Sequence, residues 1–170
     1  VIINDYSQED LERIFKVYGE IRNYKELVSI ILSKRNDKRI KTTSELKNAV
    51  QGIVPNKYEH KYLAQLFQAL RIEVNEELKV IEGMLEQATE VMEVGARLAV
   101  ITYHSLEDRL VKNFFKTGNF KGEVKKDFFG NIERPLKPVN SKPMVPSKEE
   151  ISRNNRSRSA KLRIAEKLDV

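Results

Sequence analysis

The chain has 170 residues, of which 40% are hydrophobic and 33% charged, with a formal net charge of +6. This length suits one ordinary domain or two small ones, and the absence of cysteine excludes disulfides and thiolate metal sites. No apolar run reaches the length of a membrane span and no signal-peptide pattern opens the chain, so we expect a cytoplasmic protein without a membrane partner.

The positive charge is concentrated in the last third of the chain. Residues 121–170 hold 13 basic and 7 acidic residues, whereas residues 1–120 hold 18 of each. A basic segment on a neutral body indicates a polyanionic partner, with nucleic acid first, although a solvated surface would give the same composition.

Three short amphipathic helices are predicted at the start of the chain. The first begins at the capping-box-like Ser7–Asp10 and ends at Gly19, and the second covers 24–35. The third begins at Thr42 or Thr43. Together they would form a small helical lobe.

The segment 58–92 has apolar residues at steps of three and four, which is a helical pattern. It predicts one very long helix, or two helices with a break near Arg71–Asn75. A coiled-coil dimer through the apolar residues of 63–92 is the alternative.

The stretch 97–109, RLAVITYHSLEDR, predicts a strand, a sharp turn and a helix. Leu98–Tyr103 is apolar almost throughout, which favours a strand buried on both faces in a parallel sheet. We expect Ser105 to be the N-cap of the helix, with Asp108 three residues later. His104 and Ser105 would then lie at the carboxyl end of the strand, where open α/β sheets bind ligands.

The remainder is predicted to be irregular from 117 to 146, with a short extended piece at 132–139. Ser147 would cap a short helix, and 160–166 alternates apolar and charged residues like a half-exposed strand, with a weaker helical alternative. Too few strands are present to complete an α/β sheet, so we expect further strands before Val1.

Several motifs resemble one family, the ribosomal RNA small subunit methyltransferase H family. They are FQALRI at 67–72 followed by Val74-Asn75 and Glu77-Leu78, LAVITYHSLEDR at 98–109, and RSRSAKLRI at 156–164. Asn4, Tyr6, Ser7, Tyr18-Gly19-Glu20, Thr42-Thr43 and Leu46 are similar to the family's helical insert.

The resemblance implies an α/β fold: a mostly helical fragment of a Rossmann-like methyltransferase. Residues 1–55 would be the inserted helical lobe for substrate recognition, and 56–170 the C-terminal half of the methyltransferase domain with the last strands of its sheet. The N-terminal cofactor-binding half would be absent, and with it the residues that bind S-adenosylmethionine, which are expected upstream of Val1. The chain has no G-x-G-x-x-G motif.

The activity that the resemblance implies is methyl transfer from S-adenosylmethionine to N4 of a cytidine in small-subunit ribosomal RNA. This fragment alone would be inactive. Its partners would be that RNA or the ribosomal subunit, and a homodimer is a further expectation.

His104 is the candidate catalytic residue, because a histidine at the end of a strand could hydrogen-bond the base or the RNA backbone; a structural histidine that orients the turn is the alternative. Ser105 fits an N-cap better than a nucleophile, and adjacent residues on one turn cannot easily form a His104–Ser105–Asp108 triad.

Arg71 and Asn75 are four residues apart on one predicted helix face, so they could contact RNA or brace the cluster 107–109. Arginines and lysines near the end of the chain could contact phosphates. No His, Asp or Glu grouping has metal-ligand spacing, so we predict no metal site. The substrate-binding candidates are Arg71, Asn75, His104, Ser105, Arg109, Arg153, Arg156, Arg158 and Lys161.

Two other classes of protein remain open at this point. One is a basic helical RNA-binding module without catalysis, and the other is a helical scaffold that dimerises through 63–92.

Overall fold

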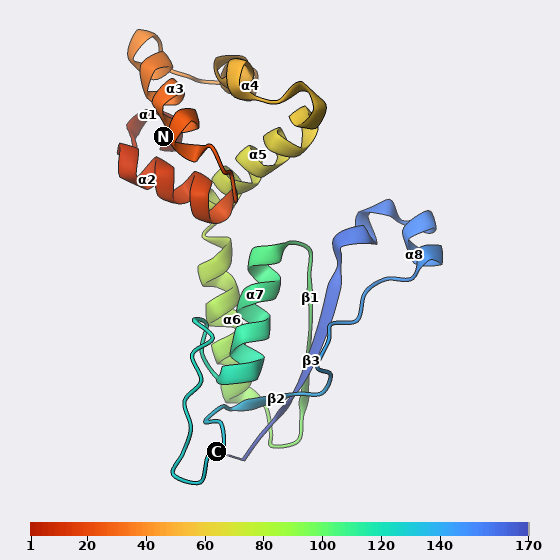
Figure 1. Ribbon diagram of the computed structural model, residues 1–170. Helices are drawn as coiled ribbons and strands as arrows, with labels where there is room; N and C mark the ends of the chain where they lie inside the picture. The colour runs from red at the N-terminus through yellow and green to blue at the C-terminus, as the bar shows by residue number, and fades with distance from the viewer. Residues whose placement is uncertain (170) are drawn as a thin grey trace. The chain divides into compact units, whose positions relative to one another are not determined.

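The computed structural model describes residues 1–169, without the side chain of Asn56. The chain divides into two compact units, Val1–Glu77 and Leu78–Val170, each with its own hydrophobic core (Figure 1). Within the described residues, no helix combines the length and apolar character that a membrane span requires.

The first unit is entirely helical. Its elements are α1 (Ile2–Asp5), α2 (Gln8–Arg13), a π-helical turn (Ile14–Tyr18), α3 (Tyr24–Asp37), α4 (Thr43–Val50), two 3-10 turns (Gln51–Ile53 and Asn56–Tyr58) and α5 (Glu59–Asn75). Apolar side chains at helical spacing bury one face of each longer helix in a shared core, which includes Leu11, Phe15, Leu27, Ile31, Val50 and Leu66.

Side-chain caps set where these helices begin. The Ser7 hydroxyl accepts a hydrogen bond from Asp10 N at 3.1 Å, and Thr42 forms a full capping box with Glu45 ahead of α4. Gly19 ends the π-helical turn. The three predicted helices, their starts and the stop at Gly19 are confirmed, whereas α1 was not predicted.

The long apolar segment consists of two helices, α5 and α6 (Glu77–Val91). Glu76 separates them in the left-handed region, with φ 49° and ψ 35°, and its N–H closes the last turn of α5 on Ile72 O. Two helices were one of the two predicted alternatives, and the break falls immediately after the expected Arg71–Asn75.

The second unit is a small sheet packed against helices. After α6 it contains β1 (Arg97–Thr102), α7 (Ser105–Thr117), β2 (Leu136–Pro138), α8 (Lys148–Arg153), a 3-10 turn (Asn155–Ser159) and β3 (Lys161–Lys167). The strand order is β1-β3-β2, and both pairings are antiparallel, with Arg97 opposite Glu166 and Leu136 opposite Lys167. Its core is formed by Leu85, Val111, Phe114, Phe115, Leu136 and Ala165.

The strand at 98–103 is confirmed, but its predicted parallel pairing and its burial on both faces are wrong. Among the described residues β1 is an edge strand, antiparallel to β3, and its side chains alternate between packed and exposed. Leu98 and Val100 pack against the core, whereas Ile101 is 57% exposed. An apolar run identifies a strand but carries no information about the direction of its neighbour.

The predictions for the part of the second unit that follows α7 hold. The segment after α7 is mostly irregular, β2 lies within the extended piece 132–139, and β3 matches the predicted strand 160–166 to within one residue at each end. Ser147 caps α8 by accepting a hydrogen bond from Glu150 N at 3.1 Å. The chain is therefore mostly helical with a small three-stranded antiparallel sheet, whereas the family-based division into 1–55 and 56–170 stays a prediction.

Candidate functional site

The turn between β1 and α7 is built around a histidine cap. His104 has an extended backbone (φ −137°, ψ 167°), and its Nδ1 accepts a hydrogen bond from Glu107 N at 3.3 Å. The prediction that Ser105 is the N-cap is wrong, because Ser105 is already the first helical residue. An imidazole nitrogen takes the place that a hydroxyl or carboxylate oxygen usually occupies.

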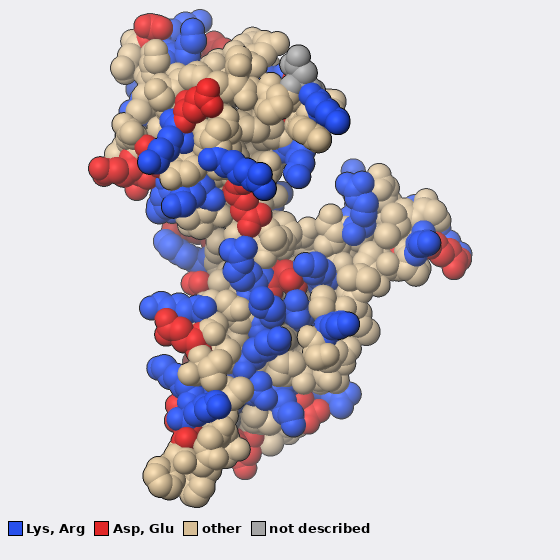
Figure 2. Space-filling model, in the orientation of Figure 1, with Lys and Arg blue, Asp and Glu red and all other residues tan. Residues whose placement is uncertain are grey.

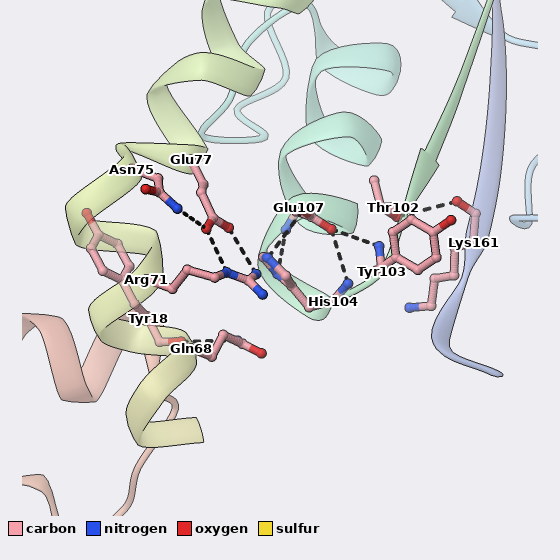
Figure 3. Close-up of polar contacts among 10 residues, drawn as sticks. All are labelled: Tyr18, Gln68, Arg71, Asn75, Glu77, Thr102, Tyr103, His104, Glu107 and Lys161. Atoms are coloured by element: carbon pink, nitrogen blue, oxygen red, sulfur yellow. Dashed lines mark hydrogen bonds and ion pairs between the residues drawn. The ribbon is translucent and has the colours of Figure 1, made fainter. Parts of the chain in front are cut away.

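Glu107 completes a capping box at this turn, in the role expected of Asp108. Its Oε2 accepts hydrogen bonds from Tyr103 N at 2.7 Å and from His104 N at 3.2 Å (Figure 3). Its Oε1 lies 3.3 Å from His104 Nε2. Because Nδ1 accepts a hydrogen bond, the neutral ring carries its proton on Nε2. The helix N-terminus, which could attract an external anion, is thus occupied by a carboxylate of the chain itself.

Asp108 fastens the start of α7 to the central strand. Its side chain is buried and accepts hydrogen bonds from Arg163 Nε at 2.7 Å, Arg163 Nη2 at 3.1 Å and Lys161 Nζ at 3.1 Å. Burial raises the pKa of Asp108, but the hydrogen bonds and positive charges of Arg163 and Lys161 outweigh it, so the pKa lies below its usual value.

Arg163 is a site residue that the sequence analysis missed. A signal was present, because Lys161 and Arg163 are two apart on a predicted strand and therefore share a face. These two β3 residues brace Asp108, whereas the bracing of the cluster 107–109 by Arg71 and Asn75 stays a prediction.

The side chains of Arg71 and Asn75 both contact the carboxylate of Glu77. The guanidinium of Arg71 contacts the Glu77 carboxylate through Nε at 2.7 Å and Nη2 at 3.1 Å, and Asn75 Nδ2 lies 3.3 Å from Glu77 Oε1 (Figure 3). These bonds span the left-handed residue Glu76 and hold the end of α5 in place. The proposed contact of Arg71 and Asn75 with RNA stays a prediction.

Arg71 and Asn75 also line a cavity of about 570 Å³ in the first unit. Its walls are mainly apolar and include Ile3, Phe67 and Val74. A concave apolar site with a few polar groups is a default binding-site candidate. No sequence pattern indicated this cavity, because its walls come from segments far apart in the chain.

The basic candidates of the second unit differ in how they are engaged. Arg153 forms an ion pair with Glu149, and the part-exposed Lys161 is held by Asp108. Arg109, Arg156 and Arg158 are exposed. Figure 2 shows further Lys and Arg side chains gathered over α7 in this view.

The fold and this turn define a mostly helical protein with a small antiparallel sheet and a self-capped strand–helix junction, and comparison with known proteins gives its family. Residues 1–168 match the profile of the MraW methylase family, and the chain belongs to that family. The family expected from the motifs is confirmed.

The curated relatives carry the name "Ribosomal RNA small subunit methyltransferase H". That of Parabacteroides distasonis is 50% identical over 167 residues, which is 98% of this chain and 55% of the relative. Those of Bacteroides fragilis and Flavobacterium johnsoniae are 51% and 50% identical, over the same shares of this chain and of the relatives. The chain spans about 55% of the length of these relatives.

Proposed function

We propose that this chain is part of an S-adenosylmethionine-dependent methyltransferase that acts on N4 of a cytidine in small-subunit ribosomal RNA. The observation that carries the proposal is the identity of about half of all positions, over 98% of the chain, with relatives named as methyltransferases of that RNA. The HSLEDR segment of this chain forms a capped turn, and Asp108 ties the helix after it to Arg163 of β3, so this segment is ordered.

The described residues at the carboxyl end of β1 do not fit S-adenosylmethionine. The N–H groups of Tyr103 and His104 are taken by Glu107, whose negative charge would repel the carboxylate of that cofactor. The sequence also lacks a glycine-rich strand–helix loop. In the proposed enzyme a Rossmann-like portion, corresponding to the part of the relatives that this chain does not span, holds the cofactor.

The contribution of this chain is positioning and RNA binding. The exocyclic amine of cytosine is a weak nucleophile, so the enzyme must orient it and accept a proton. His104 Nδ1 already accepts a hydrogen bond from Glu107 N, so the ring cannot take up a proton there without giving up the cap. This geometry supports His104 as a positioning residue. In the proposed enzyme the helical residues 1–55 form the substrate-recognition lobe, as the family resemblance implies.

A fusion protein tests the proposed activity. The chain is joined to the N-terminal portion of the Parabacteroides distasonis relative that it does not match, and transfer of labelled methyl groups to unmethylated small ribosomal subunits is measured. We expect N4-methylcytidine in the digested RNA, and no binding of S-adenosylmethionine to the isolated chain in calorimetry. A correctly folded fusion that methylates no RNA, or tight cofactor binding by residues 1–170, contradicts the proposal.

An RNA-binding module without catalysis is the second candidate function. It is favoured by the concentration of the whole positive excess in residues 121–170, where Arg156 and Arg158 are exposed. RNA binding with a steep salt dependence, together with an inactive fusion, would support it.

The expected homodimer is tested by light scattering. Leu78→Lys would lower the measured mass only if the 63–92 surface forms the dimer interface.

A further inference from the structure

Two phenylalanines stand exposed at the tip of the long segment that follows α7. Phe128 is 98% exposed and Phe129 is 85% exposed, although each ring could contribute substantially to a core. The segment extends away from the body of the second unit and ends in this tip (Figure 1). Single exposed apolar residues are common, but two adjacent aromatic rings at a projecting tip indicate a binding surface.

The tip is an ordered hairpin. Lys126 and Ile132 form an antiparallel bridge, and Glu133 N donates to Lys125 O at 3.0 Å. Closer to the tip, Asp127 N donates to Asn131 O at 2.9 Å and Gly130 N donates to Asp127 O at 3.1 Å. Hydrogen bonds therefore hold both strands of the hairpin on either side of the two rings.

Side chains and a glycine fix the turn itself. The Asp127 carboxylate accepts hydrogen bonds from Asn131 N at 2.8 Å and from Asn131 Nδ2 at 3.0 Å. Gly130 has a φ of +88°, which a residue with a side chain rarely adopts. The backbone that presents the rings is thus arranged before any ligand binds, which lowers the entropic cost of binding.

The two rings offer flat faces to a partner. Their centroids are 5.7 Å apart and their planes are 88° from each other, so they meet edge to face. In this arrangement the rings do not stack on one another. Because the side chains are almost fully exposed, a planar ligand can reach their faces.

Positive charge surrounds the rings. Segment 116–137 holds six basic residues and three acidic ones, and Lys125 and Lys126, both exposed, immediately precede the turn. One of the three acidic residues is Asp127, whose carboxylate is engaged in the turn. Flat apolar surfaces flanked by cations match a single-stranded nucleic acid, which combines base faces with phosphates.

We propose that the hairpin tip Phe128–Phe129 is a stacking platform for unpaired bases of RNA, with Lys125 and Lys126 contacting the adjacent phosphates. The proposal deepens the function proposed above and rests on it for the choice of RNA. An anionic membrane is the competing partner, but the tip carries neither tryptophan nor tyrosine, the aromatic residues that prefer the membrane interface.

The first test compares variants of the full chain in fluorescence anisotropy with a labelled stem-loop RNA and with the fully paired stem. Phe128→Ala/Phe129→Ala should bind the unpaired loop about 5- to 150-fold more weakly and leave binding of the paired stem unchanged. Phe128→Leu/Phe129→Leu should show the same loss, because leucine is apolar but offers no aromatic face. Val91→Ala, at an exposed residue of α6, is the matched control and should bind both RNAs normally.

The second test uses the fact that the chain has no tryptophan. Phe128→Trp supplies a single tryptophan at the tip, whose selectively excited emission should be quenched by the stem-loop and not by the paired stem. Unchanged loop binding by the double alanine variant, or RNA binding without quenching, overturns the proposal. A blue shift with phosphatidylglycerol–phosphatidylcholine vesicles, combined with no response to RNA, also overturns it and assigns the tip to a membrane.

The two proposals fail separately. If the fusion enzyme methylates small subunits but the tip variants bind RNA normally, the stacking platform is wrong and the proposed function stands. If the tip is quenched by unpaired RNA but the fusion is inactive, the stacking platform stands and the proposed enzyme is wrong.

Discussion

At the scale of single residues, Asp108 is a buried charge with two cationic partners. Its side chain is held by Arg163 and Lys161, and Arg163 is itself nearly buried. Asp108→Asn keeps the shape but removes the negative charge, so Arg163 is left poorly compensated. We expect the free energy of unfolding to fall by about 2 kcal/mol, measured by urea denaturation. Glu149→Gln, which removes an exposed ion pair, should change the free energy of unfolding little. Equal losses in the two variants would show that burial adds nothing to the contribution of Asp108.

The same carboxylate predicts a pH dependence. Because the folded-state pKa of Asp108 is lowered, the unfolded chain binds more protons near the unperturbed pKa of about 3.9. The stabilisation is therefore complete above that pH and is lost as the pH falls through the folded-state pKa. Unfolding curves between neutral and acidic pH should show a smaller acid loss in Asp108→Asn than in the wild type. Parallel profiles for the two proteins would rule out this assignment.

His104 can be tested as a cap separately from any part in the reaction. His104→Ala should destabilise the second unit by about 1 kcal/mol, because Glu107 N loses its acceptor. His104→Asn supplies a better capping group and should restore stability. In the fusion enzyme, a His104→Asn variant that is stable but has a reduced kcat would identify a role beyond capping, whereas full activity would leave the histidine structural.

At the scale of elements, Gly118 ends α7 at a crowded point. Its φ is +71°, and an added Cβ would lie 3.0 Å from Arg134 Cα and 3.1 Å from Glu133 O. Gly130 has a similar φ of +88° but open space around it. Gly130→Ala should therefore cost only the backbone strain of about 1 kcal/mol, and Gly118→Ala distinctly more, in thermal unfolding followed by circular dichroism. Equal losses of stability in the two variants would show that the backbone next to Gly118 shifts easily to accommodate the added Cβ.

Elements were predictable where the signal is local. Ser7, Thr42 and Ser147 begin helices as expected because each cap bonds to a backbone group three residues away. The antiparallel pairing of β1 was missed because it depends on β3, about 60 residues later. The Arg163 contact to Asp108 spans 55 residues and was missed for the same reason. His104 was missed as a cap because histidine seldom takes that role.

At the scale of the whole molecule, the uneven charge should control RNA binding. Arg156 and Arg158 are exposed, and their side chains form no ion pair with the described residues, so they can reach phosphates. Lys161 is already held by Asp108. We expect Arg156→Gln/Arg158→Gln to weaken binding of paired and unpaired RNA alike. It should also lower the slope of log affinity against log salt by about one for each arginine.

Anisotropy titrations from about 50 to 200 mM salt measure that slope. Arg22→Gln/Lys25→Gln is the matched control: it removes the same charge from the first unit, where the basic and acidic residues nearly balance. If this control lowers the slope as much as the arginine pair does, the salt dependence of RNA binding reflects only the net charge of the chain. If only the arginine pair lowers it, the final third of the chain holds the phosphates, because counterions are released only where the RNA backbone is contacted.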